Sequence, residues 1–329
     1  MKSQKNVVLA STGQRDDALL RPITAEPEVI PVVTDDGATL HVHAYGPKGA
    51  DPIVLSHGWT CCIEYWTPQI NALADRFRVI AYDQRGHGRS GFGSRKPSPD
   101  VLADDLSAVL AAAVRPGKRA LLVGHSMGGM SIMAWAGKNA DQVDRLAAGV
   151  ILMNTASDDL LAQSTVIPMP GRMRIVRTAV GRVILGAPIP LPHGSLVTRG
   201  FKYGAMSPGA TQAEVEFCQN IVVSCKGRTR GRWGMALADL DITAALENLN
   251  VPTTVIAGEL DRLTPQSHSR RLADALDRHD LLDSFVVLPG VGHMGNVEAS
   301  LQVNDEIVRM RSAAKRRRPR RSRRLSIVS

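Results

Sequence analysis

Arg119-Ala-Leu-Leu-Val-Gly-His-Ser-Met-Gly-Gly129 is the stretch that decides the fold. Its apolar run at 120–123 is short and continuous, which is typical of a central strand covered on both faces. A helical pattern of apolar residues begins directly afterwards at Met130. The turn between them reads Gly-x-Ser-x-Gly, in which the glycines let strand and helix approach closely and Ser126 at the apex is strained. The sequence therefore predicts a nucleophile elbow that presents Ser126 at one edge of a sheet.

Strand-like and helix-like segments alternate on both sides of this elbow. Two strands, at 28–33 and 39–45, are predicted on either side of an Asp-Gly hairpin signal. Short apolar runs predict further strands at 52–56, 78–82, 148–153, 253–257 and 284–288. Amphipathic patterns predict helices at 64–74, 100–114, 238–249, 266–278 and 296–311. Strands that alternate with helices form a mostly parallel sheet with helices on both faces, so the fold class is α/β.

The alternation stops after the sixth predicted strand, and this interruption divides the chain. Residues 155–235 consist of short helical pieces broken by prolines, which predicts a helical cap inserted between core segments 26–154 and 236–312. Within the cap, residues 173–185 are expected to form a lid helix that packs on the domain below rather than a membrane-surface helix. Residues 1–25 are expected to be a flexible lead-in, and residues 313–329 a disordered basic tail.

Composition and charge limit the classes of protein that fit. With 329 residues and 44% apolar residues the chain is globular, and no apolar run approaches the roughly 18 residues of a membrane span. Four cysteines without a disulfide spacing favour free thiols and a cytoplasmic protein. Eight positive charges of the net +9 lie at 315–324. The body is thus nearly neutral, and the tail could hold the protein weakly and peripherally on anionic lipid or contact nucleic acid.

A serine hydroxyl becomes a nucleophile when a histidine takes its proton and a carboxylate orients that histidine. Ligands of parallel sheets bind beyond the carboxyl ends of the strands, so partners are sought directly after strands. Asp261 follows the strand at 253–257 and His293 follows the strand at 284–288. The sequence therefore predicts the triad Ser126, Asp261 and His293, with Glu259 as the alternative acid.

The oxyanion of an acyl transfer needs backbone amides aimed at it. The residue after the nucleophile and the loop after the third predicted strand supply them in this arrangement, which selects the N–H groups of Met127 and Trp59. His57 and His125 also follow strands, and both are expected to be structural. No cofactor is expected, and no His/Cys group has the spacing of metal ligands.

These motifs together resemble the α/β-hydrolase fold superfamily over about residues 28–312. The resemblance is carried by five segments, which are His57-Gly58-Trp59, 83–90, 124–129, 258–265 and 290–293. Within the superfamily, the chain is similar to single-cap bacterial enzymes: small esterases, monoacylglycerol-lipase-like enzymes, C–C bond hydrolases and cofactor-free haloperoxidase or perhydrolase relatives. Relatives that open epoxides or remove halides carry an aspartate at the elbow, whereas this chain has Ser126. The resemblance implies the fold, the triad and the oxyanion amides already assigned.

The function expected from these residues is hydrolysis of a carboxylic ester through an acyl-enzyme on Ser126. Met, Pro, Val and Ile residues of the cap suggest an apolar pocket for a small or lipid-like acyl group. Hydrolysis of a C–C bond by the same triad is an alternative, in which Arg262 or a cap arginine would bind a substrate carboxylate. Haloperoxidase or perhydrolase chemistry is a second alternative. A binding protein that has lost catalysis is a third.

Overall fold

The computed structural model describes residues 6–8, 16–170, 173–188 and 194–316. In these residues nine strands form one sheet in the order β1-β9-β8-β7-β6-β4-β5-β3-β2. β2 and β3 pair antiparallel, as do β3 and β5, and the other pairs are parallel. The strands are β1 (Asn6–Val8), β2 (Glu28–Val33), β3 (Thr39–Tyr45), β4 (Pro52–Ser56), β5 (Arg78–Tyr82), β6 (Ala120–His125), β7 (Ala147–Met153), β8 (Thr253–Gly258) and β9 (Leu282–Leu288).

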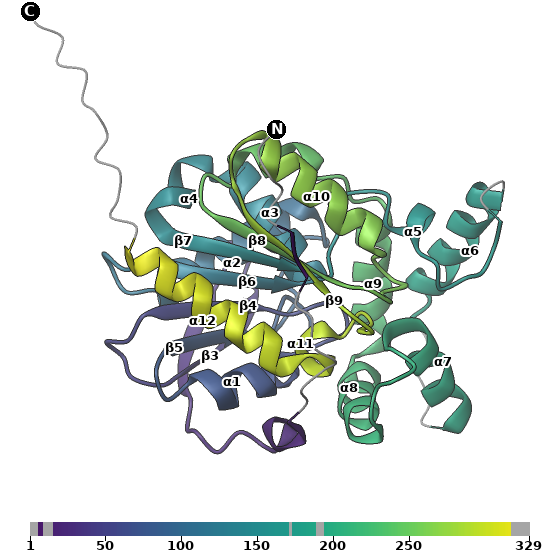
Figure 1. Cartoon of the computed structure of the whole chain (residues 1–329), viewed down its shortest axis with the longest axis horizontal. Coiled ribbons are helices and arrows are strands. Elements are labelled where there is room, and N and C mark those ends of the chain that lie inside the picture. Colours follow the sequence, from purple (N-terminus) through teal and green to yellow (C-terminus); the bar gives the residue numbers. More distant parts are fainter. Residues whose placement is uncertain (1–5, 9–15, 171–172, 189–193, 317–329) are drawn as a thin grey trace, which may run out of the picture.

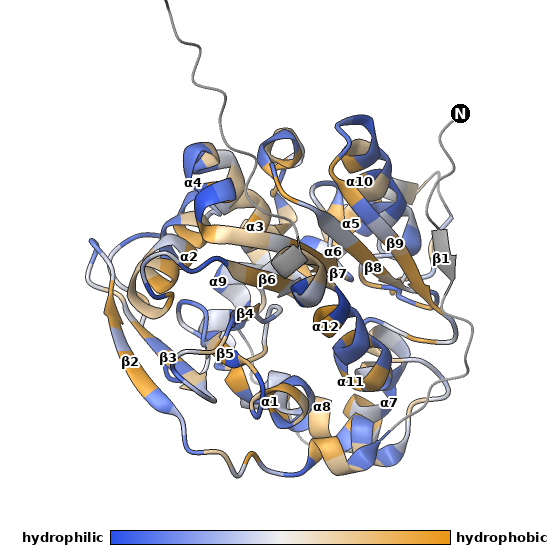
Figure 2. Cartoon of the chain, turned by 60° about the vertical axis from the view of Figure 1, so that its left-hand side comes forward, coloured by the Kyte–Doolittle hydropathy of each residue, from blue (hydrophilic) through white to orange (hydrophobic). Residues whose placement is uncertain are grey.

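Helices cover both faces of the sheet, as Figure 1 shows. One face packs against α2 (Pro99–Ala113), α3 (Met127–Lys138) and α10 (Gln266–Arg278), and the other against α1 (Thr67–Leu73) and α12 (Ser300–Arg316). The central strand β6 serves both layers, because Leu122 faces one core while Leu121 and Val123 face the other. Hydrophobic colours gather on the strands and hydrophilic ones on outer helices such as α4 (Ala140–Leu146) in Figure 2. The predicted α/β class is confirmed.

The segment between β7 and β8 forms the helical cap, which lies at one end of the sheet in Figure 1. It contains α5 (Leu160–Gln163), α6 (Arg174–Gly186), α7 (Ser195–Ala205), α8 (Gln212–Ser224) and α9 (Gly227–Ala238). The strand that precedes it, β7, is the seventh in chain order rather than the sixth as predicted, because β1 was not among the predicted strands. The expected lid helix, α6, packs on cap helices rather than on the core below: Gly181 lies against Leu161 of α5, and Gly234 of α9 lies against the Leu185 carbonyl. Its outer face is apolar, with Ile175 85% and Val183 74% exposed.

Three segments differ from the sequence-based expectations. The lead-in contains β1, which pairs parallel with β9, and a 3-10 helix at Asp17–Leu20, whose end is held by hydrogen bonds from Asn71 Nδ2 to the carbonyls of Leu19 and Arg21. The helix expected at 238–249 is instead a 3-10 helix at Thr243–Asn248, because Ile242 N–H donates to the Ser157 carbonyl and holds the chain in a turn. A short helix, α11 (Gly295–Glu298), precedes α12, which continues to Arg316 because Ala313 and Ala314 favour helix.

The expected disordered basic tail cannot be compared with the structure in full. Most of the basic run at 315–324 lies outside the described residues. Within the described part of the chain, no helix is both long and apolar enough to cross a membrane.

Candidate active site

The elbow has the backbone geometry expected of a strained turn. Ser126 has φ 52° and ψ −120°, a conformation rare for any residue other than glycine. A side chain at Gly128 would come within 1.9 Å of the Ser56 carbonyl oxygen, and one at Gly124 within 2.5 Å of the Gly128 oxygen. Both glycines are therefore required by close backbone approach. Ser126 remains partly accessible between the buried residues His125 and Met127, so its hydroxyl is available to a ligand.

Asp261 and His293 meet at the carboxyl ends of β8 and β9. His293 Nδ1 lies 2.8 Å from Asp261 Oδ2. An ionised carboxylate only accepts hydrogen bonds, so Nδ1 carries the proton and Nε2 is left with its lone pair. The His293 ring centroid is 4.8 Å from that of His125, the residue before Ser126. The structure thus brings Asp261 and His293 together beside the elbow.

Asp261 is a fully engaged carboxylate. Its Oδ1 accepts from the amides of Leu263 and Thr264, both at 2.9 Å. Its Oδ2 accepts from Thr264 Oγ1 at 2.7 Å and from Asn154 Nδ2 at 2.9 Å, besides His293. Burial raises the pKa of Asp261, but the electrostatic attraction and hydrogen bond of His293, with the hydrogen bonds of Asn154 and Thr264, outweigh it and lower that pKa below its usual value. The carboxylate therefore stays ionised and holds His293 in one tautomer.

Glu259, the alternative acid, takes no part in this contact. It is exposed, and its Oε2 accepts a hydrogen bond from the Gly290 amide at 2.8 Å. Its role is to hold the start of the loop that carries His293.

Asn154 is a site residue that sequence reasoning missed. It directly follows β7, has φ 47°, and donates through Nδ2 to Asp261 Oδ2 and to the Gly292 carbonyl. One amide group thus ties the acid to the histidine loop. Its place at the end of a strand was the available signal, because the same rule selected Asp261 and His293.

The cap is joined to the His293 loop through Glu298. Glu298 Oε2 accepts a hydrogen bond from the amide of Ser207, just after α7, at 2.8 Å. Its Oε1 accepts from the amide of Gly292 at 3.2 Å. His293 N–H donates to the Ala205 carbonyl of α7 at 2.9 Å. The base of the predicted triad is therefore positioned by the cap as well as by the core.

The loop after β4 lies against the elbow. A side chain at Gly58 would come within 3.2 Å of Ser126 Cβ. As the first residue of α3, Met127 has an amide without an intrahelical acceptor. The Trp59 amide has no acceptor within the described parts of the chain, whereas the next residue, Thr60, has φ 67° and donates from N–H to His87 Nε2 at 3.2 Å. Among the described residues, neither predicted oxyanion amide therefore has a protein acceptor.

His57 and His125 have the surroundings of structural residues. His57 Nε2 accepts from the Gln84 amide at 2.9 Å, so its Nδ1–H donates to the Gly58 carbonyl at 2.7 Å. His125 Nε2–H donates to the His293 carbonyl at 2.8 Å. Burial lowers the pKa of His57 to about 4 and that of His125 to about 3, so both rings are neutral.

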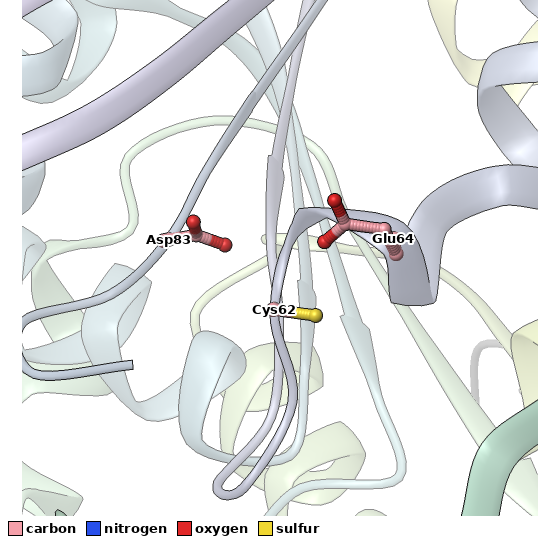
Figure 3. Close-up of side chains that lie close together, drawn as sticks. All are labelled: Cys62, Glu64 and Asp83. Carbon is pink, nitrogen blue, oxygen red and sulfur yellow. The ribbon is translucent and has the colours of Figure 1, made fainter. Parts of the chain in front are cut away.

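One group of potential metal ligands lies near the site, and Figure 3 shows it: Cys62, Glu64 and Asp83. Its ligand atoms lie within 4.8 Å of one another. However, Arg89 already pairs with both carboxylates, through Nη1 to Glu64 at 2.7 Å and Nε to Asp83 at 3.2 Å. Burial raises the pKa of the Cys62 thiol, which opposes the thiolate that a metal requires. The cluster fits a structural ion-pair network better than a metal site.

A surface cavity of about 600 Å³ lies between α6, α9 and the Lys96-Pro97 loop. Its lining residues, which include Arg228 and Arg232, contain no member of the predicted triad or of the 57–60 loop. The cavity is therefore separate from the candidate site.

Several known proteins are similar to this chain in sequence or in fold. The chain is 29% identical over 287 residues to a bifunctional esterase/perhydrolase of Acinetobacter calcoaceticus, across 85% of this chain and 99% of that protein. It is 28% identical over 272 residues to a non-heme chloroperoxidase of Burkholderia pyrrocinia, across 80% and 92%. A thermophilic esterase from Thermogutta terrifontis has the same fold, with TM-score 0.69, 24% identity and coverage of 88% and 99%.

The sequence model of the alpha/beta hydrolase family matches residues 53–306, a segment that contains the elbow, the Asp261 loop and the His293 loop. Ester hydrolysis and haloperoxidase or perhydrolase activity are both represented among the similar proteins. The chain therefore belongs to the alpha/beta hydrolase family.

Proposed function

We propose that this protein hydrolyses a carboxylic ester through an acyl-enzyme on Ser126. The observation that carries the proposal is the Asp261–His293 contact of 2.8 Å beside the strained Ser126 turn. With its Nδ1–H on Asp261, His293 has Nε2 free to act as general base. No cofactor is needed for this chemistry.

In the first half-reaction, His293 Nε2 takes the proton of Ser126 as Oγ attacks the ester carbonyl carbon. The resulting oxyanion is stabilised by the amides of Trp59 and Met127. The C–O bond to the alcohol then breaks, and His293 returns the proton to the departing alcohol. In the second half, His293 deprotonates water as it attacks the acyl carbonyl carbon. The C–O bond to Ser126 then breaks, and His293 returns the proton to Oγ, which releases the carboxylic acid and free Ser126.

Ser126→Ala removes the nucleophile and should lower turnover of p-nitrophenyl esters by on the order of 10⁴-fold or more. The unfolding midpoint should change little, because no bulky side chain is removed. Ser94→Ala is the matched control, since Ser94 is exposed and its hydroxyl donates to the Asp36 carbonyl. Turnover by Ser126→Ala close to that of the wild type would end the proposal.

Perhydrolysis is a second candidate reaction of the same acyl-enzyme. It is favoured by the similarity to a bifunctional esterase/perhydrolase. Hydrogen peroxide would replace water as the attacking nucleophile and release a peracid and free Ser126. Peracid formation from a short ester with added peroxide, lost in Ser126→Ala, would demonstrate it.

The acyl group and the location of the protein complete the proposal. The apolar residues of the cap favour a small or lipid-like acyl chain, and a cytoplasmic location agrees with the four free cysteines. A panel of p-nitrophenyl esters of graded length, with a dienoic diketone as a control for C–C hydrolysis, would define the substrate. Faster cleavage of the diketone than of every ester would favour the C–C hydrolase alternative.

A further inference from the structure

One buried arginine of this protein lacks the partner that the others have. Four arginine side chains are buried in the described residues: Arg78, Arg85, Arg230 and Arg311. Arg78 pairs with Glu28, Arg85 with Asp36 and Asp105, and Arg311 with Asp51. Arg230 is 6% exposed. In the part of the chain that the structure describes, it has no carboxylate within ion-pair distance, and its buried Nη1 has no hydrogen-bond partner.

Arg230 belongs to the part of α9 that sits on the loops around the candidate site. The indole N–H of Trp59 donates to the Arg230 carbonyl at 3.1 Å. On either side of it, Thr229 Oγ1 donates to the Gly86 carbonyl at 2.7 Å and Trp233 Nε1 to the Arg85 carbonyl at 2.8 Å. Three contacts therefore fix this turn of α9 against the loops that follow β4 and β5.

The same loop connects Arg230 to the elbow. Gly58 lies against Ser126 Cβ, and its neighbour Trp59 bonds to Arg230. Burial raises the pKa of Cys225 to about 11, and the nearby charge of Arg230 acts in the opposite direction. The backbone of Arg230 is thus fixed against the loop that carries Trp59, and its charge lies near the Cys225 thiol.

An unpaired buried guanidinium is unfavourable for folding, because burial removes its hydration and nothing replaces it. Its planar set of N–H donors matches a carboxylate in bidentate geometry. We propose that Arg230 binds an anionic group of the substrate, so that the preferred esters carry a carboxylate. This assignment rests on the proposed ester hydrolysis and names its substrate class.

Arg262, the other arginine considered from the sequence, is already engaged. Its guanidinium stacks on the Tyr203 ring at 4.4 Å and donates from Nη1 to the Tyr203 carbonyl at 2.7 Å. It is a partner of α7 rather than an open anion site. Among the buried arginines of the described residues, the lack of a carboxylate partner selects Arg230.

The test uses two esters that differ only at the end of the acyl chain, p-nitrophenyl valerate and mono-p-nitrophenyl glutarate. The wild type should prefer the glutarate monoester, and Arg230→Met should lose about 10- to 100-fold in kcat/KM on it while changing little on the valerate. Arg228→Met is the control on the same helix, because Arg228 is exposed and lines the separate surface cavity. It removes the same charge and should leave the preference intact. An equal effect of Arg230→Met on both esters would overturn the assignment.

A binding measurement keeps the assignment testable without turnover. Glutarate should raise the unfolding temperature of the wild type and of Arg228→Met but not that of Arg230→Met. Arg230→Met alone should be at least as stable as the wild type, since it removes an uncompensated buried charge. A wild type that cleaves neither ester would contradict the proposed function, whereas the glutarate shift would still decide the role of Arg230. A marked loss of stability in Arg230→Met together with an unchanged glutarate shift would show that the arginine is structural.

Discussion

Asp83 and Asp261 are two buried carboxylates at the same edge of the sheet, and their partners differ. Asp83 follows β5 and accepts from the amides of Ile63 and Arg89 at 2.7 and 2.9 Å, with Arg89 Nε at 3.2 Å. Asp261 follows β8, and it too accepts from two amides, but its remaining charge faces His293. The charged partner of Asp83 is thus a permanent cation, Arg89, and the partner of Asp261 is the titratable ring of His293.

The difference separates a structural carboxylate from one suited to catalysis. Arg89 cannot give up its proton near neutral pH, so the Asp83 network fixes the loops after β4 and β5 and does nothing else. In the proposed reaction His293 takes a proton from Ser126, so the Asp261 network would support chemistry. Position after a strand is shared by both residues, and the identity of the partner decides the role.

Asp261→Asn should produce the largest change in activity. The amide keeps the shape of the carboxylate but places an NH₂ group or a neutral oxygen against His293 Nδ1, which no longer holds the required tautomer. We expect kcat on p-nitrophenyl valerate to fall about 10³- to 10⁴-fold. Glu259→Gln, the nearby exposed control, should stay within about threefold of the wild type. Comparable losses in both variants would erase the distinction between the two acids.

Asp83→Asn should instead destabilise the protein. It breaks the pairing with Arg89 and turns a donor toward the Ile63 or Arg89 amide, which should reduce the free energy of unfolding by about 2–4 kcal/mol. Urea denaturation would measure this loss. The kcat/KM of the folded variant should remain within an order of magnitude of the wild type. A large fall in kcat/KM at unchanged stability would assign Asp83 a catalytic role and break the comparison.

Between pH 7 and 6, acid should weaken the fold through histidines, whereas the lowered pKa of Asp261 costs stability only as the pH falls to the ordinary carboxyl pKa of about 4 and below. Burial lowers the pKa of His57 to about 4 and those of His87 and His125 to about 3. Below the usual histidine pKa near 6.5, the unfolded chain binds protons that the folded protein does not, so stability falls as pH falls. These three rings should together cost about 2 kcal/mol of unfolding free energy between pH 7 and 6. Identical urea midpoints at both pH values would contradict this.

Asn154→Gly should give the smallest of these effects. Glycine tolerates the positive φ of this position, so the substitution removes only the amide that bonds to Asp261 and Gly292. A loss of about 1 kcal/mol, or roughly fivefold in kcat, is expected. The acid limb of the pH–rate profile should also move, because Asp261 loses a donor; an unmoved profile would make Asn154 merely structural.

The sequence predicted the elements that depend on local pattern. The strand around Leu122, the elbow at Ser126 and helix α10 follow from periodicity and turn chemistry, and the same rule placed Asp261 and His293 after neighbouring strands. It could not supply the features that depend on contacts far apart in the chain. The pairing of β1 with β9 joins residues about 280 positions apart, and the turn at Ile242 depends on Ser157.

The same limit applies to the site. Asn154 and Asp83 both follow a strand, and nothing in the local sequence says that one reaches Asp261 while the other meets Arg89. The isolation of Arg230 is likewise visible only when the partners of every buried arginine are known. Residue type and strand position identify candidates, whereas the three-dimensional partners determine their roles.

Labelling with a fluorophosphonate tests the central claim most directly, because this reagent reacts with an activated serine and leaves a covalent adduct. Intact mass should show one adduct per chain in the wild type, and peptide mapping should place it on Ser126. Asp83→Asn should still be labelled, whereas Asp261→Asn should be labelled far more slowly and Ser126→Ala not at all. A wild type that stays unlabelled, or an adduct on another residue, would contradict the account.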